Sequence, residues 1–244
     1  IKSLQKTPVR HLNVSISTSD QMINAKFQGK LTHESVISSM IDSVHAALEG
    51  GALTVGANAE DASRTELDYL IRFARAAKEA GACRVRYCDT LGLDSPDSIY
   101  QRIYTLARET GIDIELHCHN DVGMAVANSV SGAKGAVNGG VNAYINTTVN
   151  GVGERAGNAD LLSCILAIRF ARGVSDYLQI GDNLDLTVAW KLGHYVADAF
   201  GQPIAITQVG IGANAFAHES GIHADGMLKD RHNYEIYDHE LLGR

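Results

Sequence analysis

The segment Glu115-Leu116-His117-Cys118-His119-Asn120-Asp121 carries the strongest structural signal in this chain. Side chains along a β-strand alternate between its two faces, so His117 and His119 would point the same way, one pleat apart. Two imidazoles that converge from the end of one strand can hold a divalent metal ion. The pattern therefore predicts a strand that ends at a metal site.

A second segment, residues 147–159 with the sequence TTVNGVGERAGNA, predicts a strand end, a polar glycine-rich turn and the start of a helix. The carboxyl ends of neighbouring parallel strands share one edge of a sheet, where α/β proteins place their ligands. We therefore expect this turn to form the floor of the site beside His117. A structural ion pair between Glu154 and Arg155 is the alternative interpretation of its charged residues.

Strand and helix patterns alternate along most of the chain, which is typical of parallel βαβ units. Polar side chains gather where the strands end, as they do at the catalytic face of a (β/α)8 barrel. Such a barrel closes with eight strands, and only five are predicted. The expected fold class is therefore α/β, a partial TIM barrel followed by a small helical subdomain. Strands are predicted at 11–17, 52–57, 84–88, 112–117 and 142–147, and helices at 34–49, 64–80, 97–110, 122–138 and 158–172.

The pattern changes after Gly173. Residues 181–200 predict one helix, with Leu184, Val188, Leu192 and Val196 on one apolar stripe. A stretch punctuated by glycines follows. We expect residues 1–173 to form the carboxyl-terminal part of a barrel domain, and residues 174–244 to form a linker and helical subdomain that contributes to a neighbouring active site.

The composition is typical of a globular protein and argues against several other classes of protein. The 244 residues are 45% hydrophobic and 20% charged, which is ordinary for a globular protein with a sizeable core. A net charge of -7 without a basic run argues against a nucleic-acid partner. No apolar run approaches the ~20 residues that a membrane helix needs. Four scattered cysteines without a CxxC pair predict reduced thiols and a cytoplasmic location.

Three motifs resemble the isopropylmalate/homocitrate synthase family, the DRE-TIM metallolyase-like enzymes that condense acyl-CoA with 2-oxo acids. They are HCHNDVG at 117–123, NGVGERAGN at 150–158 and GIHADG at 221–226. The tail, LKDRHNYE at 228–235 and the terminal LGR, is most similar to the homocitrate synthases of nitrogen fixation. The resemblance spans the whole chain and implies that residues 11–147 supply strands four to eight of the barrel. It also implies that the first three strands, with an acidic metal ligand and a catalytic arginine, lie on a preceding segment or a companion chain.

The resemblance implies a metal site made by His117, His119 and Asn158. Mixed imidazole and oxygen ligands suit Zn, Mn, Mg or Co. From the residues alone, a pair of hydrogen-bonded histidines is an equally good interpretation. Cys118 alternates to the other face of the strand, so we expect it to pack in the core.

The resemblance places Glu60 in the acid/base network and Asn58, Thr90 and Thr148 at the substrate. Each assignment has a structural alternative. Glu60 follows a strand and would also stabilise the start of a helix, and residues 89–92 would also form a turn and cap.

His223 and Tyr234 are eleven residues apart, as in the homocitrate synthases. The resemblance implies that this pair reaches into the barrel of a neighbouring protomer, with His223 as general base and Tyr234 as a hydrogen-bond donor. Without the resemblance, both would be ordinary surface residues.

The implied reaction is a metal-dependent Claisen condensation of acetyl-CoA with 2-oxoglutarate, which gives homocitrate and CoA. Synthesis of 2-isopropylmalate or citramalate is the alternative within the same class. A homodimer or a hetero-assembly would supply the missing strands. An alternative of another class is a non-catalytic subunit or fragment that needs a companion chain.

Overall fold

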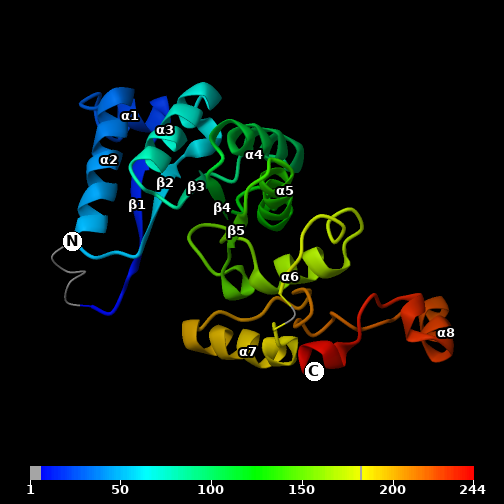
Figure 1. The fold of residues 1–244 in the computed structure, drawn as a ribbon. Coiled ribbons are helices and arrows are strands. Elements are labelled where there is room, and N and C mark those ends of the chain that lie inside the picture. Colours follow the sequence, from blue (N-terminus) through cyan, green and yellow to red (C-terminus); the bar gives the residue numbers. More distant parts are fainter. Residues whose placement is uncertain (1–6, 182) are drawn as a thin grey trace. The chain divides into compact units, whose positions relative to one another are not determined.

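The computed structural model describes residues 7–181 and 183–244. Five parallel strands form one sheet in the order β1-β2-β3-β4-β5 (Figure 1). This confirms the predicted α/β class, and all five strands lie within a few residues of their predicted positions. The strands are β1 (His11–Ser17), β2 (Thr54–Glu60), β3 (Arg84–Asp89), β4 (Asp113–Cys118) and β5 (Ala143–Asn146).

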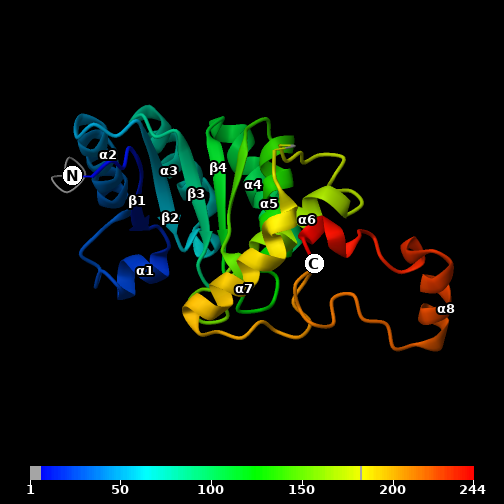
Figure 2. The ribbon, with the colours of Figure 1, turned by 90° about the horizontal axis from the view of Figure 1, so that it is seen from below.

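Helices connect consecutive strands and cover one face of the sheet (Figure 1 and Figure 2). They share that face because parallel crossovers are right-handed and the strand order is sequential. The short helix α1 was not predicted, and the predicted helices at 64–80 and 122–138 begin three residues later than expected. The helices are α1 (Asp20–Ala25), α2 (His33–Glu49), α3 (Leu67–Glu79), α4 (Pro96–Thr110) and α5 (Ala125–Asn138).

The core of this layer lies between the helices and the alternate strand residues that face them. Val55, Tyr87 and Leu116 project from the strands and are fully buried, as are Phe73 of α3 and Ile103 of α4. Each large apolar side chain buried in this way contributes about 1.5–3 kcal/mol. This packing anchors the strands, so that their other face can be polar.

Helices α4 and α5 approach each other closely because α5 presents glycines to α4. A Cβ atom on Gly135 would lie 2.7 Å from the carbonyl oxygen of Tyr100, and one on Gly139 would lie 2.5 Å from the Cβ of Ala107. Even alanine would force these backbones apart. Strand β4, which carries His117 of the predicted metal site, is thus backed by a tight helix pair.

The sheet face away from the helices is polar. Glu115 on β4 has only 7% of its side chain exposed and accepts hydrogen bonds from Arg84 Nε at 2.7 Å and Arg86 Nε at 2.8 Å. All three residues occupy the strand positions that alternate with the core residues. Asp113, the register partner of Arg84, lies on the same face, so two guanidinium groups stand against two carboxylates there.

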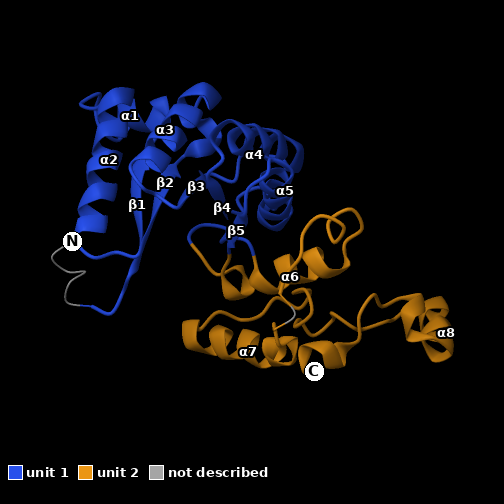
Figure 3. Cartoon of the chain, in the orientation of Figure 1, with its two compact units in different colours: residues 1–146, 154–159 blue, residues 147–153, 160–244 orange. Residues whose placement is uncertain are grey.

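The described chain divides into two compact units (Figure 3). Unit 1 contains the sheet, α1 to α5 and Glu154–Ala159, whereas unit 2 comprises Thr147–Gly153 and Asp160–Arg244. The division into 1–173 and 174–244 stays a prediction, and residues 1–6 of that first domain lie outside the described residues. No helix in the described ranges is both long and apolar enough to span a bilayer.

Unit 2 is built from helices and short 3-10 turns around a small apolar core. Its buried residues include Leu162 and Leu166 of α6, Ile211 in a loop and Leu242 near the carboxyl terminus. Its α-helices are α6 (Leu161–Phe170), α7 (Ala189–Phe200) and α8 (Gly221–Lys229).

The prediction of a single helix over 181–200 is wrong. Asp185 accepts hydrogen bonds from the backbone and hydroxyl of Thr187 and caps a 3-10 turn at Leu186–Val188, so α7 begins only at Ala189. The predicted stripe is also not the buried face, since Val188 is 50% exposed. Gly193 is buried instead, because its missing Cβ lets Ile211 pack directly against the α7 backbone.

Candidate active site

The strand register lines up polar side chains at the carboxyl end of the sheet in unit 1. Ser17 pairs with Glu60 across β1 and β2, Cys88 pairs with His117 across β3 and β4, and His117 pairs with Asn146 across β4 and β5. All of them occupy the polar face, where alternation puts every second residue. The sheet therefore presents one row of acid, thiol, imidazole and amide groups at the edge where α/β proteins bind ligands.

His117 is held by Asn146. Its Nδ1 lies 2.8 Å from the Asn146 Oδ1, and because an amide oxygen only accepts, Nδ1 carries the proton. The Nε2 atom then keeps its lone pair, which is the form of histidine that binds a metal. A hydrogen bond of this kind orients a ligating imidazole and raises its basicity.

His119 lies beside both His117 and Asn158. The two imidazole rings lie edge to face with centroids 4.9 Å apart. The backbone of His119 pairs with that of Asn158 in an antiparallel bridge, and the Asn158 amide nitrogen lies 3.3 Å from His119 Nδ1. Both histidines and Asn158 are therefore neighbours in the folded chain, although they are 41 positions apart at most.

The local environment favours the neutral form of both imidazoles. Burial lowers the pKa of His117, and the hydrogen bond to Asn146 only partly opposes this effect. Burial, followed by the charges of His117 and Arg155, lowers the pKa of His119. Metal ions bind neutral imidazole, so the pair fits a divalent ion. In residues 7–181 and 183–244, no group of three His, Cys, Asp or Glu side chains is placed to hold a metal ion. The assignment of His117, His119 and Asn158 as metal ligands stays a prediction.

Glu60 is bound to a lysine that sequence analysis did not identify. Lys26 Nζ lies 2.6 Å from Glu60 Oε2 and 3.1 Å from Ser17 Oγ, and Ser17 also donates to Glu60. Burial alone would raise the pKa of Glu60, but the hydrogen bonds from Lys26 and Ser17 and the charge of Lys26 hold it below its usual value. Glu60 is therefore a carboxylate at neutral pH.

Asn58 and Thr148 each bury a polar atom that lacks a hydrogen-bond partner in the described part of the chain. These atoms are Oδ1 of Asn58 in unit 1 and Oγ1 of Thr148 in unit 2. A buried unpaired polar atom costs about 1–3 kcal/mol. The Thr148 hydroxyl could donate to a carboxylate, whereas the Asn58 oxygen only accepts and would need a donor such as water. The predicted role of each residue at the substrate stays a prediction.

Thr90 has a structural function in unit 1. Its hydroxyl accepts a hydrogen bond from the backbone of Asp61 at 2.9 Å, and the neighbouring Asp89 accepts one from Leu93 N at 2.8 Å. The turn-and-cap interpretation of residues 89–92 is thus confirmed. The Thr90 hydroxyl acts only as an acceptor in this hydrogen bond, so its proton is still available to donate to a substrate carboxylate.

Arg155 does not pair with Glu154, its sequence neighbour. Its guanidinium forms two hydrogen bonds to Asp121, at 2.8 and 2.9 Å, and donates to the carbonyl of Thr90 at 2.5 Å. It thereby fastens the turn after Gly153 to the loops that follow β3 and β4. This contact also helps to hold Asn158 against His119.

His223 and Tyr234 lie together in unit 2. Their rings stack with centroids 4.1 Å apart and an interplanar angle of 25°. His223 lies on α8, and the chain turns back at Asp230 so that Tyr234 returns to the helix. Both residues are exposed, as a pair that meets a substrate must be. Their catalytic roles stay predictions.

Sequence analysis missed two residues of the site in unit 1. Asn146 is the last residue of β5. Its position at a strand end, like that of His117, could have indicated that the two side chains lie side by side. Lys26 lies nine residues beyond Ser17, after α1. No spacing rule connects it to Glu60, so only the folded chain reveals the contact.

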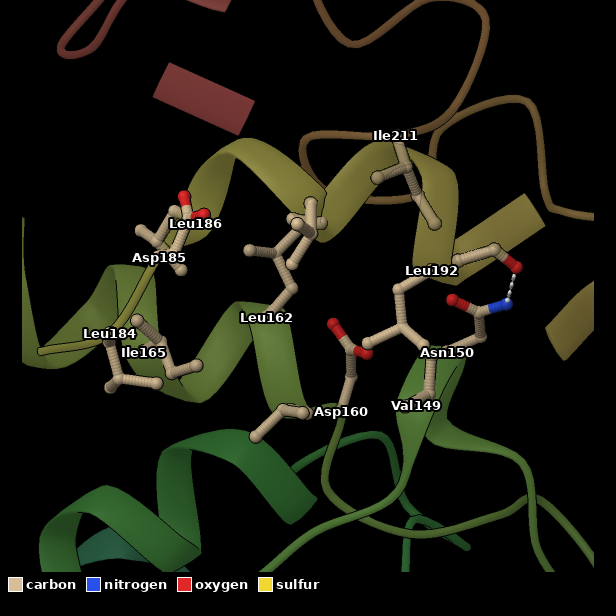
Figure 4. A pocket seen from close by; sticks show the side chains of 14 residues that line it. Val149, Asn150, Asp160, Leu162, Ile165, Leu184, Asp185, Leu186, Leu192 and Ile211 are labelled. Atoms are coloured by element: carbon tan, nitrogen blue, oxygen red, sulfur yellow. Dashed lines mark hydrogen bonds between the residues drawn. The ribbon is translucent and has the colours of Figure 1, made fainter. Parts of the chain in front are cut away.

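A separate apolar pocket of about 140 Å³ lies in unit 2 (Figure 4). Leu162, Ile165 and Leu192 line it, and Asn150 closes one end by donating to the carbonyl of Gly193 at 2.8 Å. Asp160, the acid nearest to Asn150 in the lining, is occupied in capping α6 through Ser163. The pocket thus lacks the paired titratable groups found at the end of the sheet.

Two family models match the chain. Residues 1–196 match the model described as HMGL-like, and residues 211–244 match Homocitrate synthase post-HMGL domain-like. The Citrate (Re)-synthase of Dehalococcoides mccartyi is 56% identical over 97% of this chain and 57% of its own length. The 2-isopropylmalate synthase 2 of Caldanaerobacter subterraneus is 41% identical over 94% of this chain and 56% of its own length.

This chain therefore spans about half the length of the curated relatives it matches. Among solved structures, hydroxymethylglutaryl-CoA lyase from Pseudomonas aeruginosa superposes with a TM-score of 0.65. That superposition covers 83% of this chain and 67% of the lyase at 16% identity, so it supports the fold alone.

Proposed function

Because this chain belongs to the HMGL-like family, we propose that the protein carrying it condenses acetyl-CoA with a 2-oxo acid and releases CoA. The observation that carries the proposal is the neutral His117–His119 pair beside Asn158, at the same end of the sheet as the Glu60 carboxylate. His117, His119 and Asn158 would hold a divalent ion, which when bound polarises the keto group of the oxo acid.

The chain's own residues would supply binding and proton transfer. Asn58 and Thr90 would donate hydrogen bonds to the oxo acid, and Asn146 keeps His117 oriented. His223 would accept a proton from the acetyl methyl group, whose carbon then bonds to the keto carbon. Tyr234 would donate to the oxygen on which negative charge develops, and water then cleaves the thioester. Glu60, already ionised, would stabilise and orient rather than donate a proton.

We infer that the oxo acid carries a second carboxylate. The match of residues 211–244 to Homocitrate synthase post-HMGL domain-like supports 2-oxoglutarate, with homocitrate as product. The identity to Citrate (Re)-synthase supports oxaloacetate, with citrate as product, as the second candidate.

The test is thiol release from acetyl-CoA by the complete protein with four oxo acids in parallel. We expect 2-oxoglutarate or oxaloacetate to exceed 2-oxoisovalerate and pyruvate by at least about 100-fold in kcat/KM, because a site built for a charged group strongly rejects analogues that lack it. Preference for 2-oxoisovalerate or pyruvate would reassign the product to 2-isopropylmalate or citramalate. No thiol release with any acid, in metal-replete protein, would favour the non-catalytic alternative.

We also propose a cytoplasmic protein that works as a homodimer or with a companion chain. Sedimentation of the complete protein, alone and mixed with a candidate companion, distinguishes these assemblies. The resemblance to the homocitrate synthases of nitrogen fixation supports a role in cofactor assembly, and the 2-isopropylmalate synthase relative supports amino-acid biosynthesis.

Lys26→Met is expected to shift the acid limb of the kcat/KM profile to higher pH. Lys26 holds the pKa of Glu60 down, so its removal lets Glu60 protonate at a higher pH. The same contact stabilises the wild-type fold above the unfolded-state pKa of about 4.3, and this contribution is lost as pH falls through the folded-state pKa. Lys30→Met, at an exposed lysine nearby, is the matched control. An unchanged acid limb in Lys26→Met would exclude Glu60 from the titration that limits activity.

A further inference from the structure

A carboxylate and a histidine lie behind the His223–Tyr234 stack in unit 2. The side chain of Glu235 is only 8% exposed and that of His218 is 18% exposed. Glu235 Oε1 lies 3.3 Å from His218 Nε2. A carboxylate that accepts from one ring nitrogen of histidine fixes the orientation of the ring.

The ring of His218 contacts both members of the stack. Its centroid lies 5.9 Å from that of His223, at an interplanar angle of 63°, and 6.2 Å from that of Tyr234, at 57°. Edge-to-face contacts in this range are favourable between aromatic rings. One histidine thus contacts both rings of the stack.

Tyr234 is also supported from α8. A Cβ atom on Gly226 would lie 2.4 Å from the Cε2 of Tyr234, so only glycine lets the ring lie flat on the helix. The preceding Asn233 donates to the carbonyl of Gly226 at 3.0 Å and fastens the returning chain. The Tyr234 ring therefore has contacts to both helix α8 and His218.

The charge of Glu235 is directed mainly to His218. Glu235 Oε2 has no hydrogen-bond partner within the described ranges, and its nearest cation, Arg231 Nε, is 3.7 Å away. Arg231 is shared with the exposed carboxylates of Asp238 and Glu240, at 3.7 and 3.5 Å. His218 is consequently the hydrogen-bonding partner of this buried acid.

We propose that Glu235 and His218 are positioning residues that hold His223 and Tyr234 in their stacked geometry. Glu235 orients His218, and His218 limits the rotation of the two rings that would contact the substrate. The catalytic consequence of this proposal rests on the proposed function, because it matters for turnover only if His223 and Tyr234 act on the acetyl group. The positioning role itself depends only on the contacts of Glu235 and His218 within unit 2.

The test compares Glu235→Leu, Glu235→Gln and His218→Leu in the complete protein. Glu235→Gln keeps the size of the side chain and an oxygen that accepts from His218, so it is the conservative variant. His232→Leu removes an exposed histidine that contacts Asp230 instead, and it is the matched control. The first readout is the NMR shift of the His223 ring protons, which lie in the ring current of Tyr234.

We expect the His223 ring protons to shift in His218→Leu and Glu235→Leu and to keep wild-type shifts in Glu235→Gln and His232→Leu. In the kinetic assay, kcat is expected to fall about 10- to 100-fold in the two leucine variants, since misplaced catalytic groups cost this much. The KM for the oxo acid should stay within about twofold, because the loss is confined to the chemical step.

Unchanged His223 shifts in folded His218→Leu would overturn the positioning role. So would shifted His223 protons with a wild-type kcat. If the wild-type protein shows no turnover with any oxo acid, the proposed function fails, and the NMR shifts alone still confirm or overturn the structural role of Glu235 and His218.

Discussion

His117→Ala in the complete protein is expected to lower kcat by roughly three orders of magnitude and to reduce bound metal after dialysis. Lewis-acid stabilisation is worth several kcal/mol, and each ~1.4 kcal/mol is tenfold in rate. His117 is the imidazole with an available Nε2 and an orienting partner in Asn146. Asn146→Ala should therefore weaken metal binding by a smaller factor, about 10- to 100-fold, as is usual for the partners of ligating histidines.

Bound metal is measured by elemental analysis, and kcat by steady-state kinetics, on the same protein preparations. His45→Ala is the control, because His45 is exposed on α2 and lies outside the row at the sheet end. Full metal content and full turnover in folded His117→Ala would mean that the two histidines only hydrogen-bond to their neighbours. That is the alternative that the residues alone left open.

Glu115→Ala is expected to be the most destabilising single change on the polar face, by about 3 kcal/mol. Breaking a buried ion pair from one side leaves the partner charge uncompensated. Here two guanidinium groups, of Arg84 and Arg86, would lose one shared carboxylate, and both are four-fifths buried. The measurement is the shift in the midpoint of urea denaturation at constant slope.

The matched control is Glu109→Ala, which removes a carboxylate from an exposed pair with Arg75. Exposed ion pairs contribute about 0–1 kcal/mol, so its midpoint should hardly move. Equal shifts in the two variants would contradict the view that the arginine–glutamate cluster is a buried structural element. Glu115→Gln should fall between them, since it keeps an acceptor but loses the charge.

Much of the site could be predicted because its residues follow strand ends. His117 and His119 share a face through simple alternation, Glu60 is the last residue of β2, and Thr90 follows the neighbouring β3. Lys26 could not be found in this way, since its contact with Glu60 depends on how α1 folds back over the end of β1. The same holds for Glu235 and His218, 17 residues apart, whose contact requires the reversal of the chain after α8.

Prediction was poorest where the chain leaves the strand–helix repeat. The stripe from Leu184 to Val196 resembles an amphipathic helix, yet a capping aspartate at position 185 starts a 3-10 turn instead. Hydrophobic periodicity registers the spacing of apolar side chains but not a competing side-chain hydrogen bond to the backbone. The burial of Gly193 also gives no periodic signal, because its packing depends on the absence of a side chain.

The amino-acid sequence by itself determined the parallel order of strands and helices, the polar character of the strand ends and the pair of histidines on one face. These properties are local, since they follow from side-chain alternation and helix periodicity over a few residues. Only the tertiary structure decided that Asn146 orients His117, that Asn158 reaches His119, that Lys26 neutralises Glu60 and that Glu115 lies between two arginines. Each of these contacts joins residues far apart in the chain, and such contacts exist only once the packed layers bring the strand ends together.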